Sequence, residues 1–123
     1  MHRKLLIAAI AGLVSVSAAN AMDVATFLAK GAVLQERGVM AMFASEYEEI
    51  QAEIRTSYAS LKQERLAARN AGRRPAYCPP GPASLTMQEM LGAMTAVPPA
   101  RRSHVQVRDA LRAAFARKYP CPG

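Results

Sequence analysis

The sequence is poor in the residues that build metal centres. Its 123 residues include only two cysteines and two histidines, and one of the histidines, His2, lies in a segment that we expect to be removed. A zinc site draws three or four ligands from His, Cys and carboxylates, and His104 has no clustered partner in the sequence. A copper site made of methionines would also need histidine beside it. We therefore expect no metal and no cofactor.

Catalytic groups are equally sparse. Ser103, His104 and Asp109 could be written as a hydrolase trio, but they are neighbours in the sequence and lack a nucleophile elbow. Three glutamates share one side of an expected helix: Glu46, Glu49 and Glu53. Paired carboxylates can perform acid and base chemistry, although acids near a helix start are also stabilised by the helix dipole. The sequence predicts a protein that is not an enzyme.

No apolar run is long enough to be a convincing membrane span. The longest, Leu5 to Ala19, is shorter than the roughly 20 residues that a spanning helix needs. It follows the positive segment His2-Arg3-Lys4 and ends in Ala19-Asn20-Ala21, an A-x-A cleavage pattern. These features predict a signal peptide over residues 1–21, cleaved near Ala21-Met22, with an uncleaved anchor as the alternative. We expect a periplasmic or secreted protein, whose formal net charge falls from +7 to +5 on cleavage.

Strand patterns are also missing, because no stretch alternates apolar and polar residues for long enough. Residues 22–123 therefore predict a single all-α domain of about four helices. The first helix is expected to begin after Asp23 as N-cap and to end at Gly38. Residues 39–44 are ambiguous and could form a short helical turn.

The longest expected helix runs from Ser45 to about Ala71. Ser45 and Glu48 form a capping-box pattern at its start. Its apolar positions fall on one helical face: Tyr47, Ile50, Ile54, Tyr58 and Leu61.

Two shorter helices are expected to follow. Thr86 and Glu89 form a second capping-box pattern, and Ser103 with Gln106 signals the last helix, which ends near Tyr119. The first of these helices is expected to bury Met87 or Met90, Leu91 and Met94. The last is expected to bury Val107, Leu111, Ala114 and Phe115. The methionines at helical spacing favour core filling, with an adaptable partner surface as the alternative: Met40, Met42, Met87, Met90 and Met94.

The two cysteines, Cys78 and Cys121, are expected to form a disulfide, because an exported protein meets an oxidising compartment. In the loop-entropy model, closing a loop of this length stabilises the fold by roughly 4 kcal/mol.

Arginines provide the strongest charge pattern. Four lie near the end of the long helix and two precede the last one: Arg65, Arg69, Arg73, Arg74, Arg101 and Arg102. They predict a basic surface that could bind an acidic protein, anionic lipid or phosphate, or that could be a solvated helix end whose cations complement the helix dipole. Aromatic residues do not interleave with these arginines, so we expect no nucleic-acid partner.

The C-terminal part, residues 77–122, carries a recognisable series of motifs. It begins with Tyr77-Cys78-Pro79-Pro80-Gly81, continues through Met87-Gln88-Glu89-Met90-Leu91 and Pro98-Pro99, and closes with Ala110-Leu111, Phe115 and Tyr119-Pro120-Cys121. This series resembles the Rap/Tai group of periplasmic immunity proteins, which protect bacteria from peptidoglycan amidases delivered by type VI secretion.

The resemblance implies an exported helical protein that binds and neutralises an amidase, and it implies no cofactor. Residues 22–76 lack the further cysteines and the Cys-x-Gly-Tyr segment of typical members. The alternative is an envelope module whose basic helix end binds anionic lipid or cell-wall polymer.

Overall fold

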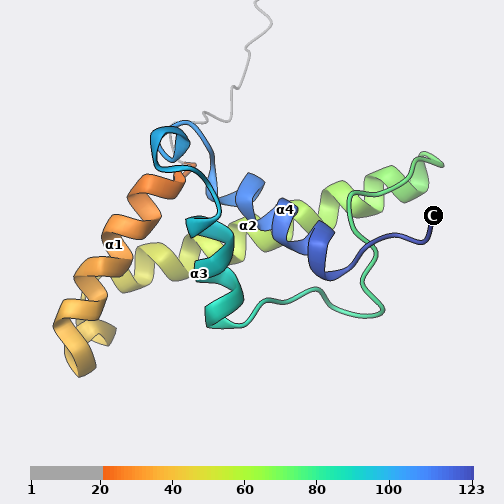
Figure 1. Cartoon of the computed structure of the whole chain (residues 1–123). Helices are drawn as coiled ribbons and strands as arrows, with labels where there is room; N and C mark the ends of the chain where they lie inside the picture. The colour runs from red at the N-terminus through yellow and green to blue at the C-terminus, as the bar shows by residue number, and fades with distance from the viewer. Residues whose placement is uncertain (1–20) are drawn as a thin grey trace, which may run out of the picture.

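The computed structural model describes residues 21–123, and four α-helices dominate this part of the chain (Figure 1). The signal peptide expected over residues 1–21 lies outside the described residues except for Ala21. In chain order the elements are α1 (Val24–Arg37), the 3-10 helix η2 (Gly38–Phe43), α2 (Ser45–Asn70), α3 (Met87–Thr95), the 3-10 helix η3 (Pro99–Arg101) and α4 (Val107–Lys118). The only β-type pairing in these residues is an isolated antiparallel β-bridge between Asp23 and Gln106. The predicted all-α class is confirmed.

Helix α1 begins and ends where the sequence predicts. The Asp23 carboxylate accepts a hydrogen bond from the Thr26 N–H at 2.7 Å, which satisfies one of the free donors of the first turn. Gly38 ends the helix with a φ of 57°, a conformation that glycine adopts without steric cost. The chain then forms the short 3-10 helix η2, which agrees with the short helical turn that the sequence allows for residues 39–44.

Helix α2 is the long axis on which α1 and α4 pack. It contacts α1 near its start and α4 farther along, while α3 packs on α4 (Figure 1). Its N-cap is Ala44 rather than the expected Ser45, whose hydroxyl donates to the Glu46 carboxylate at 3.4 Å. The capping box expected for Ser45 and Glu48 is therefore wrong, because Ser45 already lies inside the first helical turn.

The second capping-box prediction is confirmed. The Glu89 N–H donates to the Thr86 hydroxyl at 3.1 Å, and the Thr86 N–H donates to the Glu89 carboxylate at 2.9 Å. The third is wrong, because α4 begins after Gln106 and Ser103 lies in the preceding turn.

The hydrophobic core lies between α2, α3 and α4, with the start of α1 covering one side. All four residues expected to face inward from α4 are buried: Val107, Leu111, Ala114 and Phe115. Met90 and Met94 fill the core from α3, whereas Leu91 is exposed, contrary to expectation. Tyr47 is also exposed rather than core-facing, because it lies at the start of α2 beside the exposed residues of η2.

A disulfide between Cys78 and Cys121 ties the connector after α2 to the segment after α4, as the sequence predicts. The two Cα atoms are 4.8 Å apart, and the bond spans 43 residues of sequence. Two hydrogen bonds reinforce the junction: the Cys78 N–H donates to the Tyr119 carbonyl at 2.8 Å, and Arg74 Nη2 donates to the Cys121 carbonyl at 2.9 Å. The connector is thus held to the C-terminal end of α4 by covalent and polar contacts.

We expect reduction of this disulfide to lower the melting temperature by about 15–30 °C. The loop-entropy stabilisation of about 4 kcal/mol corresponds to that shift for a domain of about 100 residues. Circular dichroism melts of residues 22–123 with and without reductant measure it, and a Cys78→Ser, Cys121→Ser double variant melted without reductant is the control. An unchanged melt with both thiols shown to be free would contradict the prediction.

Candidate functional site

The six arginines expected to form a basic surface lie in two separate groups. Arg65, Arg69, Arg73 and Arg74 lie in the last turns of α2 and the residues that follow it. Arg101 and Arg102 lie in and after η3, where the Arg102 carbonyl accepts a hydrogen bond from the Ala25 N–H in the first turn of α1. The end of α2 lies at the right of the molecule, well apart from the start of α1 at its top (Figure 1). The six residues therefore do not form one continuous patch.

Two of these arginines donate hydrogen bonds to backbone carbonyls and so stabilise the fold. Arg102 donates from Nε to the Val97 carbonyl at 2.8 Å and from Nη2 to the Thr95 carbonyl at 3.1 Å. Arg74 donates to the Cys121 carbonyl beside the disulfide. The remaining cations near the end of α2 are freer to meet a ligand.

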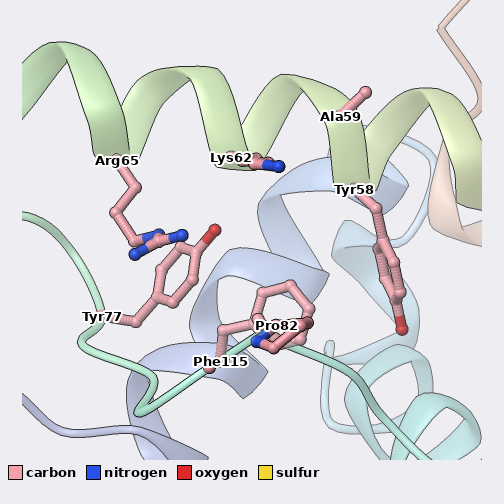
Figure 2. A pocket seen from close by; sticks show the side chains of 9 residues that line it. Tyr58, Ala59, Lys62, Arg65, Tyr77, Pro82 and Phe115 are labelled. Atoms are coloured by element: carbon pink, nitrogen blue, oxygen red, sulfur yellow. The ribbon is translucent and has the colours of Figure 1, made fainter.

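A groove runs between α2 and the connector that follows it. Arg65 and Tyr77 both line three adjacent hollows along this groove, with volumes of about 310, 360 and 310 Å³. Figure 2 shows the first hollow, where Lys62 and Arg65 come from α2, Pro82 comes from the connector, and Phe115 lies on the inner side. We call this first hollow the tyrosine pocket, because Tyr58 and Tyr77 form two of its walls.

Packing fixes the aromatic walls of the tyrosine pocket. Phe115 is 1% exposed, and its ring centroid lies 5.3 Å from that of Tyr58 and 5.0 Å from that of Tyr77. The Tyr58 hydroxyl accepts a hydrogen bond from the Leu85 N–H at 3.2 Å. The guanidinium carbon of Arg65 lies 5.9 Å from the centre of the Tyr77 ring, which is a cation–π distance.

Both tyrosines are protonated at neutral pH, because the usual pKa of a tyrosine is about 10 and burial raises it further. Desolvation raises the pKa of Tyr77 above its usual value, and the positive charge of Arg65 opposes that rise. Desolvation also raises the pKa of Tyr58, partly offset by the hydrogen bond from Leu85. The net charge of the pocket walls therefore comes from Lys62 and Arg65.

Nearby acids are already paired. Arg112 donates to both oxygens of the Glu64 carboxylate, from Nη2 at 2.7 Å and from Nε at 3.0 Å, and to the Asp109 carboxylate at 2.8 Å. These contacts raise the pKa of Arg112 above its usual value, the Glu64 hydrogen bonds having the largest effect. Neither Lys62 nor Arg65 forms an ion pair with an acid among residues 21–123.

The second notable surface is η2 at the opposite end of α2. Its side chains are strongly exposed, at 87% for Val39 and 79% for Phe43, and two methionines accompany them, Met40 and Met42. We call these four residues the apolar tip. Glu46, Glu48 and Glu49 follow directly in the first turns of α2, and Glu49 pairs with Lys30 of α1. The prediction of core filling is thus wrong for Met40, Met42 and Met87, which are exposed, and confirmed for Met90 and Met94.

The candidate catalytic groups do not assemble into a reactive centre. Asp109 is bound to Arg112, while Ser103 and His104 are exposed in the turn before α4. Glu53 accepts a hydrogen bond from the Ser57 hydroxyl at 3.2 Å, one helical turn along α2. Among residues 21–123, no three His, Cys, Asp or Glu side chains cluster as metal ligands.

The sequence interpretation missed the tyrosine pocket. The sequence pattern places Tyr58 only on the apolar face of a helix and Tyr77 only in the cysteine motif. It gives Lys62 no role. No local pattern identifies the pocket, because its walls come from α2, the connector and α4.

Comparisons with protein-family models, curated proteins and solved structures find no match to the chain. Within residues 21–123, no helix combines the length and the apolar character that a membrane crossing requires.

We expect Tyr77→Ala to destabilise the protein by about 3–5 kcal/mol, the usual cost of truncating a buried aromatic side chain. Tyr77 is 3% exposed and packs on Phe115. Tyr77→Phe keeps that packing and is the matched control, expected to melt within a few degrees of the parent. Urea unfolding monitored by circular dichroism measures both variants. Equal stability of Tyr77→Ala and the parent would show that the connector is not anchored through this ring.

Proposed function

We propose that the mature chain is an exported, non-enzymatic protein that binds a partner protein, and that this partner is a secreted peptidoglycan amidase which it neutralises. The apolar tip is the observation that carries the binding role. The resemblance of residues 77–122 to the Rap/Tai immunity proteins is what suggests an amidase as the partner.

The apolar tip has the composition of a protein-binding surface. Large apolar side chains that cluster on the surface of a small protein mark interaction sites more often than single exposed residues do. Phe43 and Val39 can fill a pocket on a partner, and Met40 and Met42 can adapt to its shape because the thioether chain is flexible.

Charge beside the apolar tip favours a particular kind of partner. Glu46 and Glu48 lie in the first turn of α2, directly after the tip. The pKa of Glu46 lies below its usual value, mainly because a backbone N–H donates to its carboxylate. A pocket with an apolar floor and a basic rim would complement this end of the molecule.

A second candidate function rests on the other end of α2. Arg69 and Arg73 are exposed there, and their side chains form no ion pair with residues 21–123. Together with Lys62 they could bind anionic lipid or an acidic cell-wall polymer as an envelope module.

The primary proposal predicts that an amidase effector is encoded beside this gene, that the two proteins form a tight complex, and that amidase activity is lost in that complex. Val39→Ser with Phe43→Ser should weaken binding at least about 30-fold, the effect of removing a hot spot of about 2 kcal/mol. Leu91→Ser is the control, because Leu91 is also an exposed apolar residue but lies on α3. Calorimetry measures affinity, and cell-wall digestion measures inhibition.

Two results would refute this proposal. One is the absence of any complex with a co-encoded toxin, together with unchanged sensitivity of a deletion strain. The other is equal binding by the tip variant and the parent, which would place the interface elsewhere.

The envelope alternative predicts binding to phosphatidylglycerol vesicles that falls steeply between low and moderate salt, because exposed charges are screened. Arg69→Gln with Arg73→Gln should abolish vesicle co-sedimentation, whereas Val39→Ser with Phe43→Ser should leave it unchanged. Salt-resistant binding, or equal binding to neutral vesicles, would exclude this alternative.

A further inference from the structure

The tyrosine pocket lies apart from the apolar tip and has no role in the partner contact proposed above. Its residues on α2 begin at Tyr58, 13 residues after the helix start at Ser45. At 1.5 Å per residue this separation is about 20 Å along the helix. Binding at one site can therefore be measured without the other.

The pocket has the size and composition of a small-ligand site. Its volume of about 310 Å³ is at the lower end of the range for such sites. Tyr58 and Pro82 give it partly accessible apolar walls, whereas Tyr77 and Phe115, at 3% and 1% exposed, lie behind them as its closed floor (Figure 2). Such walls favour a flat apolar body that lies against the Tyr58 ring and Pro82.

Two cations at the rim set the charge of the ligand. Lys62 is exposed and Arg65 is half-buried, and both line the pocket. The adjacent acid, Glu64, cannot neutralise them readily, because both of its carboxylate oxygens accept hydrogen bonds from Arg112. The tyrosine hydroxyls are uncharged at neutral pH, because the usual pKa of a tyrosine is about 10, and burial raises the pKa of both groups further.

The Arg65 guanidinium is also incompletely satisfied. Its Nε atom is buried and has no hydrogen-bond partner among residues 21–123, an arrangement that costs free energy in a folded protein. A carboxylate matches the planar guanidinium fork with two parallel hydrogen bonds, whereas an ammonium ion interacts as a point charge. A small side-chain adjustment toward a bound carboxylate would therefore give Arg65 the partner that the protein does not provide.

We infer that the tyrosine pocket is a binding site for a small organic carboxylate carried on a flat apolar body. Arg65 and Lys62 bind the carboxylate, and Tyr58 and Pro82 contact the body. The ligand sits against the connector that the disulfide ties to the segment after α4.

Benzoate tests this inference, with benzamide as a neutral molecule of the same shape. In a ¹H–¹⁵N correlation spectrum of residues 22–123, benzoate should shift the amide signals of Ala59, Lys62, Gly81 and Ala83 saturably, in the millimolar range. Benzamide should bind at least fivefold more weakly. Signals from the apolar tip should not move.

Variants assign the charge contribution to the two cations. Arg65→Gln and Lys62→Gln should each weaken benzoate binding at least fivefold. Arg55→Gln is the matched control, because Arg55 is exposed on α2 but does not line the pocket. Lys62→Gln decides the result if Arg65→Gln proves unstable, since Lys62 is exposed and makes no ion pair with the described residues.

Three outcomes would overturn the inference. Equal affinity for benzoate and benzamide would show that the cations do not select an anion. Displacement of benzoate by inorganic phosphate at equal concentration would indicate a general basic patch rather than a carboxylate site. The absence of saturable shifts at the named amides would show that the pocket binds no such ligand.

Discussion

The packing of Phe115 is the interaction on which the rest of the structure depends. This fully buried ring on α4 meets Tyr58 from α2, Tyr77 from the connector and Tyr119 after α4, at centroid distances of 5.3, 5.0 and 6.1 Å. Helix α2 and the connector, which are both distant in sequence from α4, are therefore fixed relative to one side chain. The disulfide stabilises the same region, because Cys78 directly follows Tyr77 and Cys121 lies two residues after Tyr119.

The concentration of contacts at this end explains why the other end exposes apolar residues. Most of the fully buried large side chains come from α2, α3 and α4, and α1 contributes only Val24 and Phe27 to the buried core. Helix η2 is six residues long and, within residues 21–123, packs mainly on α1 and α2, and none of its residues is buried. The apolar tip is thus a consequence of the way the chain distributes its core-forming residues.

Much of the helical structure could be predicted from local chemistry, as Asp23, Gly38 and the Thr86–Glu89 pair show. The errors arise where tertiary contacts control the local structure. Ser103 could have capped α4, but the backbone there is engaged by the start of α1: the Val24 N–H donates to the Val105 carbonyl at 2.9 Å, and the Val107 N–H donates to the Met22 carbonyl at 2.9 Å. Because of these bonds, the helix starts only at Val107.

Tertiary contacts also separate Arg101 and Arg102 from the other arginines, because sequence spacing contains no information on where η3 packs in the fold.

The charge order along α2 connects these observations. Its first turns carry Glu46, Glu48 and Glu49, whereas Arg65 and Arg69 lie in its last turns. A helix of 26 residues extends about 39 Å, well beyond the Debye length of about 8 Å at physiological salt, so the two ends present independent electrostatic surfaces. The acidic end has an apolar tip beside it, and the basic end has an aromatic pocket held by the disulfide. Loss of the disulfide would release one wall of the pocket while leaving η2 and its contacts with α1 intact, because those contacts are local in sequence. The two surfaces therefore differ in their relation to the disulfide: η2 packs on α1 and α2, its neighbours in the sequence, whereas the pocket includes Gly81 and Pro82, which lie within the loop closed by Cys78 and Cys121.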